Sequence, residues 1–377
     1  MSKPPHSSKA DSNIEGTPMR VLIVGSGRLG ISIARLLSTD PSYEVCIIDT
    51  NYEKVRAAAE LGFESHEQSG SDKRAMQKLL SNAAAVVVAA PESIAVRVAQ
   101  FADEYGCSYF DLCEYTDVSA EIERIAKSSN QAFVSQCGLA PGYVSALVYE
   151  KIQNLDAQAK INAYVGVLPE TKINKLGFGN IWDIRGLITE YTKPCKVIIG
   201  GDSCEISPRT KYETLDIEGT QYEAFTTAGT LDDVVKCSVG KINDLFFKTL
   251  RYQGHLDYIN FLLDDLGLKD RIYTFRNLLQ TGLPVVIEDK VVIHLVTETT
   301  DESGIHEDRQ TQVFHSRPES DGTRTSAISV ASAAHVCSVL DVVCNRKPAS
   351  VGFLDHTKIS LSELAQSKFF SDLNEQI

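Results

Sequence analysis

The sequence lacks the features of a disulfide-bonded, zinc-binding or membrane-spanning protein. Its nine cysteines are scattered singly, and none forms a Cys-x-x-Cys pair, which favours reduced thiols in a cytosolic enzyme. No His, Glu and Cys residues stand at metal-ligand spacing, so we expect no metal site. The longest apolar stretch, residues 83–90, is the length of a strand and stops at Pro91, so we expect no membrane-spanning segment.

Basic clusters and two common catalytic motifs are also missing. The 377 residues carry a formal net charge of −13. Without clustered lysine and arginine we expect no nucleic-acid partner and no anionic membrane partner. The chain has neither a Gly-x-Ser-x-Gly nucleophile turn nor a Gly-x-x-x-x-Gly-Lys-Ser/Thr phosphate loop. Chemistry would therefore rest on a cofactor, in a soluble, cytoplasmic protein.

A glycine-rich motif is the strongest positive feature. The apolar residues 21–24 lead into Gly25-x-Gly27-x-x-Gly30 and then a helical pattern. Gly25 permits a tight turn, Gly27 lets the backbone approach a pyrophosphate, and Gly30 lets the helix lie close to the sheet. This order of strand, glycines and helix predicts a dinucleotide site that includes Arg28 and Leu29.

Asp49 bears on the choice of dinucleotide. It ends a second apolar run, nineteen residues after Gly30, where a carboxylate accepts hydrogen bonds from the adenosine ribose. The same charge repels the 2′-phosphate of NADP, so we expect NAD. Lys54 and Arg56 lie near enough in sequence to keep NADP as an alternative, and Asp49 could also cap the following helix.

The first part of the chain alternates strand-like and helix-like segments, which predicts a Rossmann-type, doubly wound parallel sheet over residues 19–142. Residues 1–18 are polar and form an expected disordered tail. The expected strands are 20–25, 44–49, 62–65, 84–89, 108–112 and 132–136. The expected helices are 28–39, 51–61, 71–81, 92–105 and 117–129.

Residues 143–324 have a different pattern, which predicts a second, α+β domain with a mixed, mostly antiparallel sheet for substrate and dimer contacts. Expected strands are 159–167, 195–199, 203–207, 222–227, 234–240, 285–296 and 309–315. Expected helices are 144–153, 180–190 and two around 255–280. Residues 325–377 form a C-terminal segment with helices at 325–344 and 360–367, which we expect to return to the first domain.

Candidate site residues follow the predicted strand ends. Ligands of open α/β sheets bind at the carboxyl edge, so Ala90, Pro91 and Cys113 are further candidates for cofactor binding. Asp111 and Tyr115 could contact substrate, although Asp111 could equally cap a helix. The rigid turn formed by Gly138, Leu139, Ala140, Pro141 and Gly142 suits a substrate carboxylate, with an interdomain turn as the alternative.

A second group of candidates surrounds Gly254. Arg251 suits recognition of a carboxylate, and His255 titrates near neutral pH, so it could act as an acid or base. Glu114 is the other candidate base. On the helix expected at 180–190, Trp182 and Arg185 could wall a cleft, but a core tryptophan with a surface arginine is the simpler interpretation.

With these pieces in place the chain resembles the saccharopine dehydrogenase superfamily, most of all its lysine 6-dehydrogenases. The resemblance rests on residues 25–30, 137–142 (Cys-Gly-Leu-Ala-Pro-Gly), 186–194 (Gly-Leu-Ile-Thr-Glu-Tyr-Thr-Lys-Pro), 249–255 (Thr-Leu-Arg-Tyr-Gln-Gly-His) and 352–356. It implies a homodimer that uses NAD or NADP to oxidise or form a C–N bond of a lysine-like amino acid or amine. The sequence departs from the family pattern at Gln253 and at Cys113-Glu114.

Three functions stay open at this point. The first is oxidative deamination of a lysine-like amine, with His255 or Glu114 as base and Arg251 on the substrate carboxylate. The second is reductive condensation that forms saccharopine or a carboxy-polyamine. The third is a dinucleotide-binding protein whose substrate site has decayed, which the departures at Gln253 and Glu114 motivate.

Overall fold

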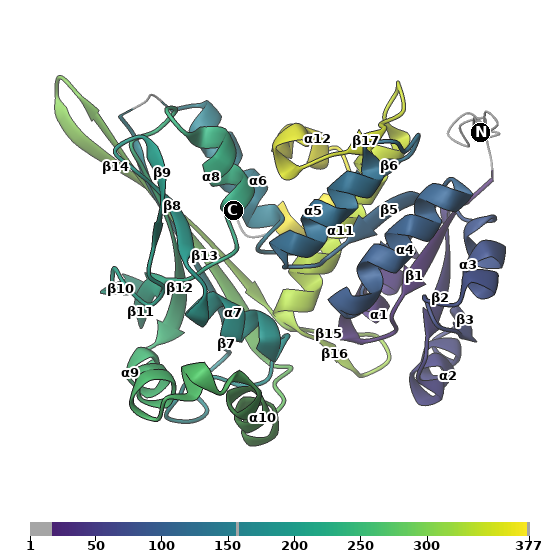
Figure 1. Cartoon of the computed structure of the whole chain (residues 1–377), viewed down its shortest axis with the longest axis horizontal. Coiled ribbons are helices and arrows are strands. Elements are labelled where there is room, and N and C mark those ends of the chain that lie inside the picture. Colours follow the sequence, from purple (N-terminus) through teal and green to yellow (C-terminus); the bar gives the residue numbers. More distant parts are fainter. Residues whose placement is uncertain (1–16, 156–157, 375–377) are drawn as a thin grey trace. The chain divides into compact units, whose positions relative to one another are not determined.

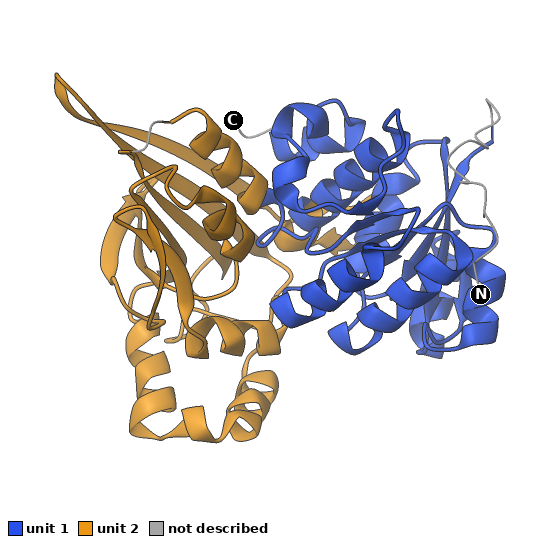
Figure 2. Ribbon diagram, turned by 45° about the horizontal axis from the view of Figure 1, so that its top comes forward, with its two compact units in different colours: residues 1–143, 331–374 blue, residues 144–330, 375–377 orange. Residues whose placement is uncertain are grey.

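The computed structural model describes residues 17–155 and 158–374, so most of the tail expected at residues 1–18 lies outside the described residues. Figure 2 shows two compact units, which we describe separately. Unit 1 contains the described residues up to Tyr143 together with 331–374, and unit 2 contains residues 144–330 without 156–157. The C-terminal segment therefore belongs mainly with the N-terminal residues.

Unit 1, whose elements are labelled in Figure 1, is built on a seven-stranded, fully parallel sheet of order β17-β6-β5-β4-β1-β2-β3, as predicted for a doubly wound fold. Its N-terminal elements are β1 (Met19–Val24), α1 (Arg28–Leu37), β2 (Tyr43–Asp49), α2 (Tyr52–Glu60), β3 (Glu64–Glu67), α3 (Lys73–Leu80), β4 (Ala85–Val88), α4 (Glu92–Tyr105), β5 (Ser108–Asp111), α5 (Thr116–Ala126) and β6 (Ala132–Val134). Its C-terminal elements include most of α11 (Ala327–Asn345), then β17 (Gly352–Phe353), α12 (Leu361–Leu364) and α13 (Ser371–Asn374).

The sheet of unit 1 is buried on both faces, as expected for parallel strands covered by helices. Alternate residues such as Leu22 and Val86 pack against α3, α4 and α5, represented by Met76 and Phe101. Each expected strand and helix of this region is present, with ends within about three residues of the prediction.

Unit 2 holds an eight-stranded mixed sheet in which β12 and β7 are parallel and the other pairs are antiparallel. Its strands are β7 (Lys160–Pro169), β8 (Cys195–Ile199), β9 (Asp202–Ile206), β10 (Glu213–Ile217), β11 (Thr220–Thr226), β12 (Asp244–Tyr252), β13 (Asp289–Asp301) and β14 (Gly304–His315), followed by the hairpin β15 (Arg317–Pro318) and β16 (Arg324–Thr325). Its helices are α6 (Tyr143–Gln153), α7 (Ile184–Thr192), α8 (Asp232–Ser238), α9 (His255–Asn260) with a π-helical turn at Phe261–Asp265, and α10 (Ile272–Gly282).

One predicted strand of this unit is wrong. Two strands of the eight-stranded sheet and the short hairpin β15–β16 are unpredicted. Residues 234–240 contribute to helix α8 because Asp232 and Asp233 fill its first turn, where acidic groups stabilise a helix. Strands β10 and β12 lie in ranges without an expected strand. Most residues of β12 are buried on both faces, so its sequence lacks the alternation typical of a half-exposed strand.

Helix α11 corrects the expectation that no segment has membrane-spanning length. Among the described residues it is the one helix long and apolar enough to cross a membrane, with a mean hydropathy of 1.8. However, 78% of that stretch is buried inside the protein. A mostly buried helix of this kind is typical of a protein core, and its small residues, among them Ala331 and Ala334, are almost fully buried.

Candidate active site

The glycine loop of unit 1 is closed by contacts that leave no room for side chains at two positions. Gly25 has a φ of +108°, and a Cβ there would lie 2.4 Å from the carbonyl oxygen of Ala89. A Cβ on Gly30 would lie 1.9 Å from the carbonyl oxygen of Gly25. Because both contacts are with backbone atoms, the loop is held against the β4–α4 turn and the start of α1.

Gly27 differs from its neighbours because it faces open space. A Cβ at this position would meet nothing within 4 Å, and Gly27 is the N-cap of α1 without any side-chain cap. The first turn of α1 also carries no acidic residue that would repel an anion. An open glycine at an uncapped helix N-terminus fits a pyrophosphate group, so these residues suit a dinucleotide.

Asp49 holds the same loop in place through hydrogen bonds. Its Oδ2 accepts hydrogen bonds from the backbone N–H of Ser26 at 2.8 Å and the Ser26 hydroxyl at 3.0 Å. Its Oδ1 accepts from the N–H of Asn51 at 2.9 Å. Burial alone would raise the pKa of Asp49, but these donors outweigh it and the pKa is lowered. The side chain is therefore a charged acceptor at the end of β2.

The remaining cofactor candidates follow the ends of β4 and β5. Ala90 follows β4, and a Cβ on Gly25 would come within 3.3 Å of the Ala90 side chain. Pro91 is the N-cap of α4. Cys113 follows β5 and is half-buried, as are Glu114 and Tyr115 beside it. Their contacts with a cofactor or a substrate remain predictions.

Asp111 is almost fully buried at the end of β5, where it joins two strand ends of the sheet. Its carboxylate accepts hydrogen bonds from the Tyr109 and Ser135 hydroxyls and from the N–H groups of Cys113 and Gln136, at 2.8–3.0 Å. Burial raises its pKa despite these donors. The carboxylate predicted to touch substrate therefore orients the segments that carry Cys113 and Gln136.

The turn at residues 138–142 is folded tightly upon itself. Gly142 has a φ of +130°, and a Cβ there would lie 2.0 Å from the carbonyl oxygen of Gly138. The N–H of Tyr143 donates to that same oxygen at 3.1 Å. His335 of α11 and His356 contact the preceding carbonyl oxygens of Cys137 and Ser135, each at 3.1 Å. This turn is thus braced by the C-terminal segment of unit 1.

In unit 2, the predicted pair Arg251 and His255 belongs to a buried polar cluster. The His255 Nδ1 lies 2.8 Å from the carbonyl oxygen of Leu176, and its Nε2 lies 2.8 Å from the Tyr191 hydroxyl. The Arg251 Nε donates to the same hydroxyl at 2.8 Å. The Arg251 Nη2 faces Glu190 Oε2 at 3.5 Å.

Burial sets the charge of this cluster. It lowers the pKa of His255 to about 3, with a further lowering from the positive charge of Arg251, so the imidazole is neutral. Burial raises the pKa of Glu190 to about 7, although Arg251 opposes that rise. Glu190 and Tyr191 carry no predicted role. The signal that could have found them is their place in the family motif at residues 186–194.

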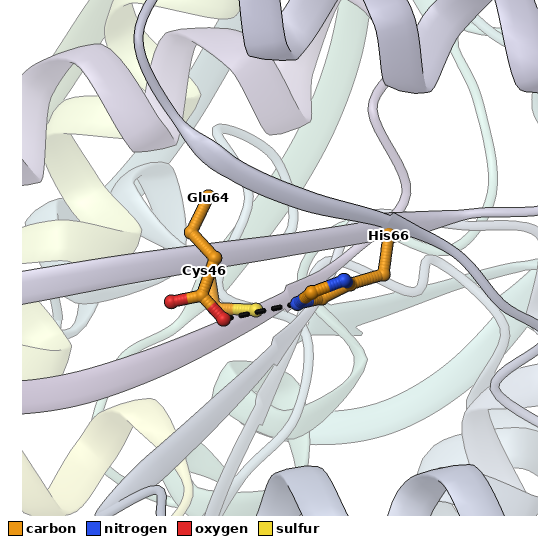
Figure 3. Close-up of side chains that lie close together, drawn as sticks. All are labelled: Cys46, Glu64 and His66. Atoms are coloured by element: carbon orange, nitrogen blue, oxygen red, sulfur yellow. Dashed lines mark hydrogen bonds and ion pairs between the residues drawn. The ribbon is translucent and has the colours of Figure 1, made fainter.

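Cys46, Glu64 and His66 form another cluster, at the edge of the parallel sheet (Figure 3). Among the described residues it is the one group that could hold a metal ion, because its ligand atoms all lie within 4.8 Å of one another. The Nη2 of Arg20, however, already donates to both carboxylate oxygens of Glu64 at 2.6 Å. Burial also raises the pKa of Cys46 to about 12, which keeps the thiol protonated. We assign this cluster to the pairing of β1, β2 and β3.

Two family models match adjacent stretches of the chain. The family model described as the saccharopine dehydrogenase NADP binding domain matches residues 21–138, and the saccharopine dehydrogenase C-terminal domain matches residues 138–346. Among solved structures, apo histidine-tagged saccharopine dehydrogenase (L-Glu forming) from Saccharomyces cerevisiae is similar with a TM-score of 0.77 and 16% identity, over 95% of this chain and 97% of that chain.

A second solved structure is more distant. The C. glutamicum DAP dehydrogenase in complex with DAP matches with a TM-score of 0.50 and 12% identity, over 96% of this chain and all of that chain. Identities this low show the fold alone, but the family models cover most of the sequence. The chain therefore belongs to the saccharopine dehydrogenase family of NAD(P)-dependent oxidoreductases.

Proposed function

We propose that the chain oxidises a C–N bond of a lysine-like amino acid. The observation that carries the proposal is the pairing, within one chain of this family, of an open dinucleotide loop at Gly27 with a buried arginine–glutamate pair. In that pair Arg251 is 2% exposed and Glu190 is 18% exposed, so it is the Glu190 carboxylate that complements the ammonium group of an amino acid. When bound, NAD or NADP supplies the acceptor for the hydride that leaves the carbon bearing the amine.

The side chains of the protein divide the remaining tasks. We propose that the 138–142 turn binds the substrate carboxylate. Glu114, which is half-buried after β5, is a candidate base. His255 is fully buried with both ring nitrogens engaged, and Arg251 is 2% exposed. We therefore give these two residues a positioning role in place of direct contact with substrate.

A second candidate reaction is the formation or cleavage of saccharopine-like compounds. The fold similarity to the S. cerevisiae protein, named saccharopine dehydrogenase (L-Glu forming), favours it. The two reactions differ in substrate number, because reductive condensation must seat both an aldehyde and an amino acid or diamine. They share the hydride step at a C–N bond.

Nicotinamide absorbance distinguishes these candidates. Lysine with NAD or NADP tests deamination, saccharopine with NAD or NADP tests cleavage, and the semialdehyde with glutamate or diaminobutyrate and reduced cofactor tests condensation. Turnover of lysine alone supports the first proposal, and turnover of the other sets replaces it with the second. Tight NAD binding without turnover of any set would contradict both and support a decayed site.

We further propose a homodimer, on the basis of the family resemblance and one feature of unit 2. Strand β14 ends the path of the sheet, and its outer edge pairs with no strand among the described residues. Exposed edges of this kind favour pairing with another chain. Light scattering coupled to size exclusion tests the proposal, which predicts twice the mass of one chain.

A further inference from the structure

A continuous chain of polar contacts links the core of unit 2 to Glu190. A carbonyl oxygen only accepts, so the contact with Leu176 places the proton of His255 on Nδ1. The Nε2 of the neutral ring then accepts from the Tyr191 hydroxyl. The lone pairs of that hydroxyl are left for the Nε–H of Arg251. Each hydrogen bond in this series therefore has only one possible donor.

These polar contacts hold the Arg251 guanidinium in place. Besides Tyr191, Nη1 donates to the carbonyl oxygen of Leu250 at 2.9 Å. The guanidinium carbon lies 5.1 Å above the Phe178 ring, a distance at which cation–π attraction operates. The remaining amino group, Nη2, is directed to Glu190. Arginine is suited to this task because its planar group holds several hydrogen bonds in a fixed geometry.

Glu190 is the outermost member of the cluster and the least satisfied. Its side chain is 18% exposed, whereas Arg251 is 2% exposed. Its ion pair with Arg251, at 3.5 Å, is long for a charge-assisted hydrogen bond. By contrast, Glu223 in the same unit accepts from the N–H groups of Gly254 and Leu256. A carboxylate with a fixed counter-charge, spare acceptor capacity and access to solvent can exchange a proton with a bound molecule.

Resting on the proposed function, we propose that Glu190 binds the substrate ammonium and takes its proton before hydride transfer. The carboxylate and the ammonium become a carboxylic acid and a neutral amine. The nitrogen lone pair then forms the C=N bond as a hydride leaves the same carbon, and bound NAD or NADP would supply the acceptor for that hydride. Water adds to the iminium and releases ammonium and a carbonyl product, so atoms and charges balance.

The other members of the cluster are positioning residues in this scheme. Arg251 keeps Glu190 oriented and prevents its pKa from rising further. Tyr191 and His255 fix the guanidinium without touching substrate. The titratable groups that act on this cluster are these residues together with Glu223, Lys172 and Cys195. A carboxylate with a pKa near 7 suits a base that works close to neutral pH.

The pH profile of Glu190→Gln tests the inference, with Glu205→Gln as the matched control because Glu205 is exposed on β9. In the wild type and the control we expect kcat/KM to fall below about pH 7 as Glu190 takes up a proton. Glu190→Gln should lose about 100-fold in kcat/KM at pH 8 and lose this acid limb. Circular dichroism confirms that the variant is folded.

Two further outcomes separate the inference from the proposed function. If the wild type oxidises an amine but Glu190→Gln keeps the acid limb, or Glu114→Gln loses it instead, the role of Glu190 is refuted while the function stands. If the wild type turns over none of the substrate sets, the function itself fails. Infrared absorption of the protonated carboxyl group gives a readout without turnover: a band titrating near pH 7 should vanish in Glu190→Gln, and its persistence there would overturn the assignment.

Discussion

Two glycines of the cofactor loop are expected to respond differently to a methyl group. Gly30→Ala places a Cβ against the carbonyl oxygen of Gly25, so the loop must move. Overpacking of this kind costs about 1–3 kcal/mol of unfolding free energy, and cofactor binding should fall with it. Denaturant unfolding and a fluorescence titration with NADH measure the two effects.

Gly27→Ala is the matched control for that stability loss. Its Cβ meets nothing within 4 Å, and the φ of −69° suits any residue. The unfolding free energy should stay within about 0.5 kcal/mol of wild type. The methyl group nevertheless fills the approach to the phosphates, so NADH affinity should fall about tenfold, or ~1.4 kcal/mol. Unchanged affinity would show that the pyrophosphate does not bind at Gly27.

Asp49 should set the preference between the two dinucleotides. In Asp49→Asn, one oxygen still accepts from Ser26 while the negative charge is lost. Repulsion of a 2′-phosphate disappears with that charge, so the ratio of NADP to NAD affinity should rise about tenfold. Titrations with NADH and NADPH provide this ratio. An unchanged ratio would assign the preference to other residues.

At the level of elements, Asp289 of β13 caps a helix that begins 38 residues later. Its buried carboxylate accepts from the N–H groups of Ala327 at 2.6 Å and Ile328 at 3.2 Å, in the first turn of α11. Asp289→Ala leaves these donors buried without that acceptor, so we expect a loss of about 1–3 kcal/mol. Exposed Asp270→Ala should change the unfolding free energy by less than about 0.5 kcal/mol.

Such distant contacts show why the fold was easier to predict than the site. Most strands of unit 1 were recognisable because strand-like runs alternate with helical patterns, and Gly25, Gly27 and Gly30 lie close together in sequence. The two-residue strand β17 was not predicted. In contrast, β12 is buried on both faces and shows no alternation. Arg251 and His255 were found from their proximity in sequence. Their partners Glu190 and Tyr191 lie about 60 residues earlier, and only the folded sheet and helices bring them together.

For the whole molecule, acid should destabilise unit 1 more than unit 2. Burial lowers the pKa of His335 in unit 1 and of His255 in unit 2 to about 3. In the unfolded chain the pKa of histidine is about 6.5, so below that pH the unfolded chain binds protons that the folded protein does not. Each of these two histidines therefore lowers the unfolding free energy by about 1.4 kcal/mol at pH 5.5. His356, also in unit 1, has a lowered pKa and adds to that loss.

Protonation of Glu190 has the opposite effect on the unfolding free energy, so it offsets the loss of stability in unit 2. Its pKa is raised to about 7, so the folded protein binds a proton that the unfolded chain releases above pH 4.5. Between pH 7.5 and 5.5 this uptake returns about 1.8 kcal/mol, which slightly exceeds the ~1.4 kcal/mol that His255 removes. The lowered pKa of His294 acts in the same direction as that of His255 and opposes this surplus in unit 2.

The sole tryptophan, Trp182, makes this difference measurable because it lies in unit 2. Its fluorescence reports the unfolding of that unit, whereas circular dichroism reports both. From pH 7.5 to 5.5 the unfolding midpoint should fall more by circular dichroism than by fluorescence. Glu190→Gln removes the offset, so it should make the fluorescence midpoint more sensitive to acid. A fluorescence midpoint that falls as steeply in the wild type as in that variant would mean that Glu190 does not titrate in this range.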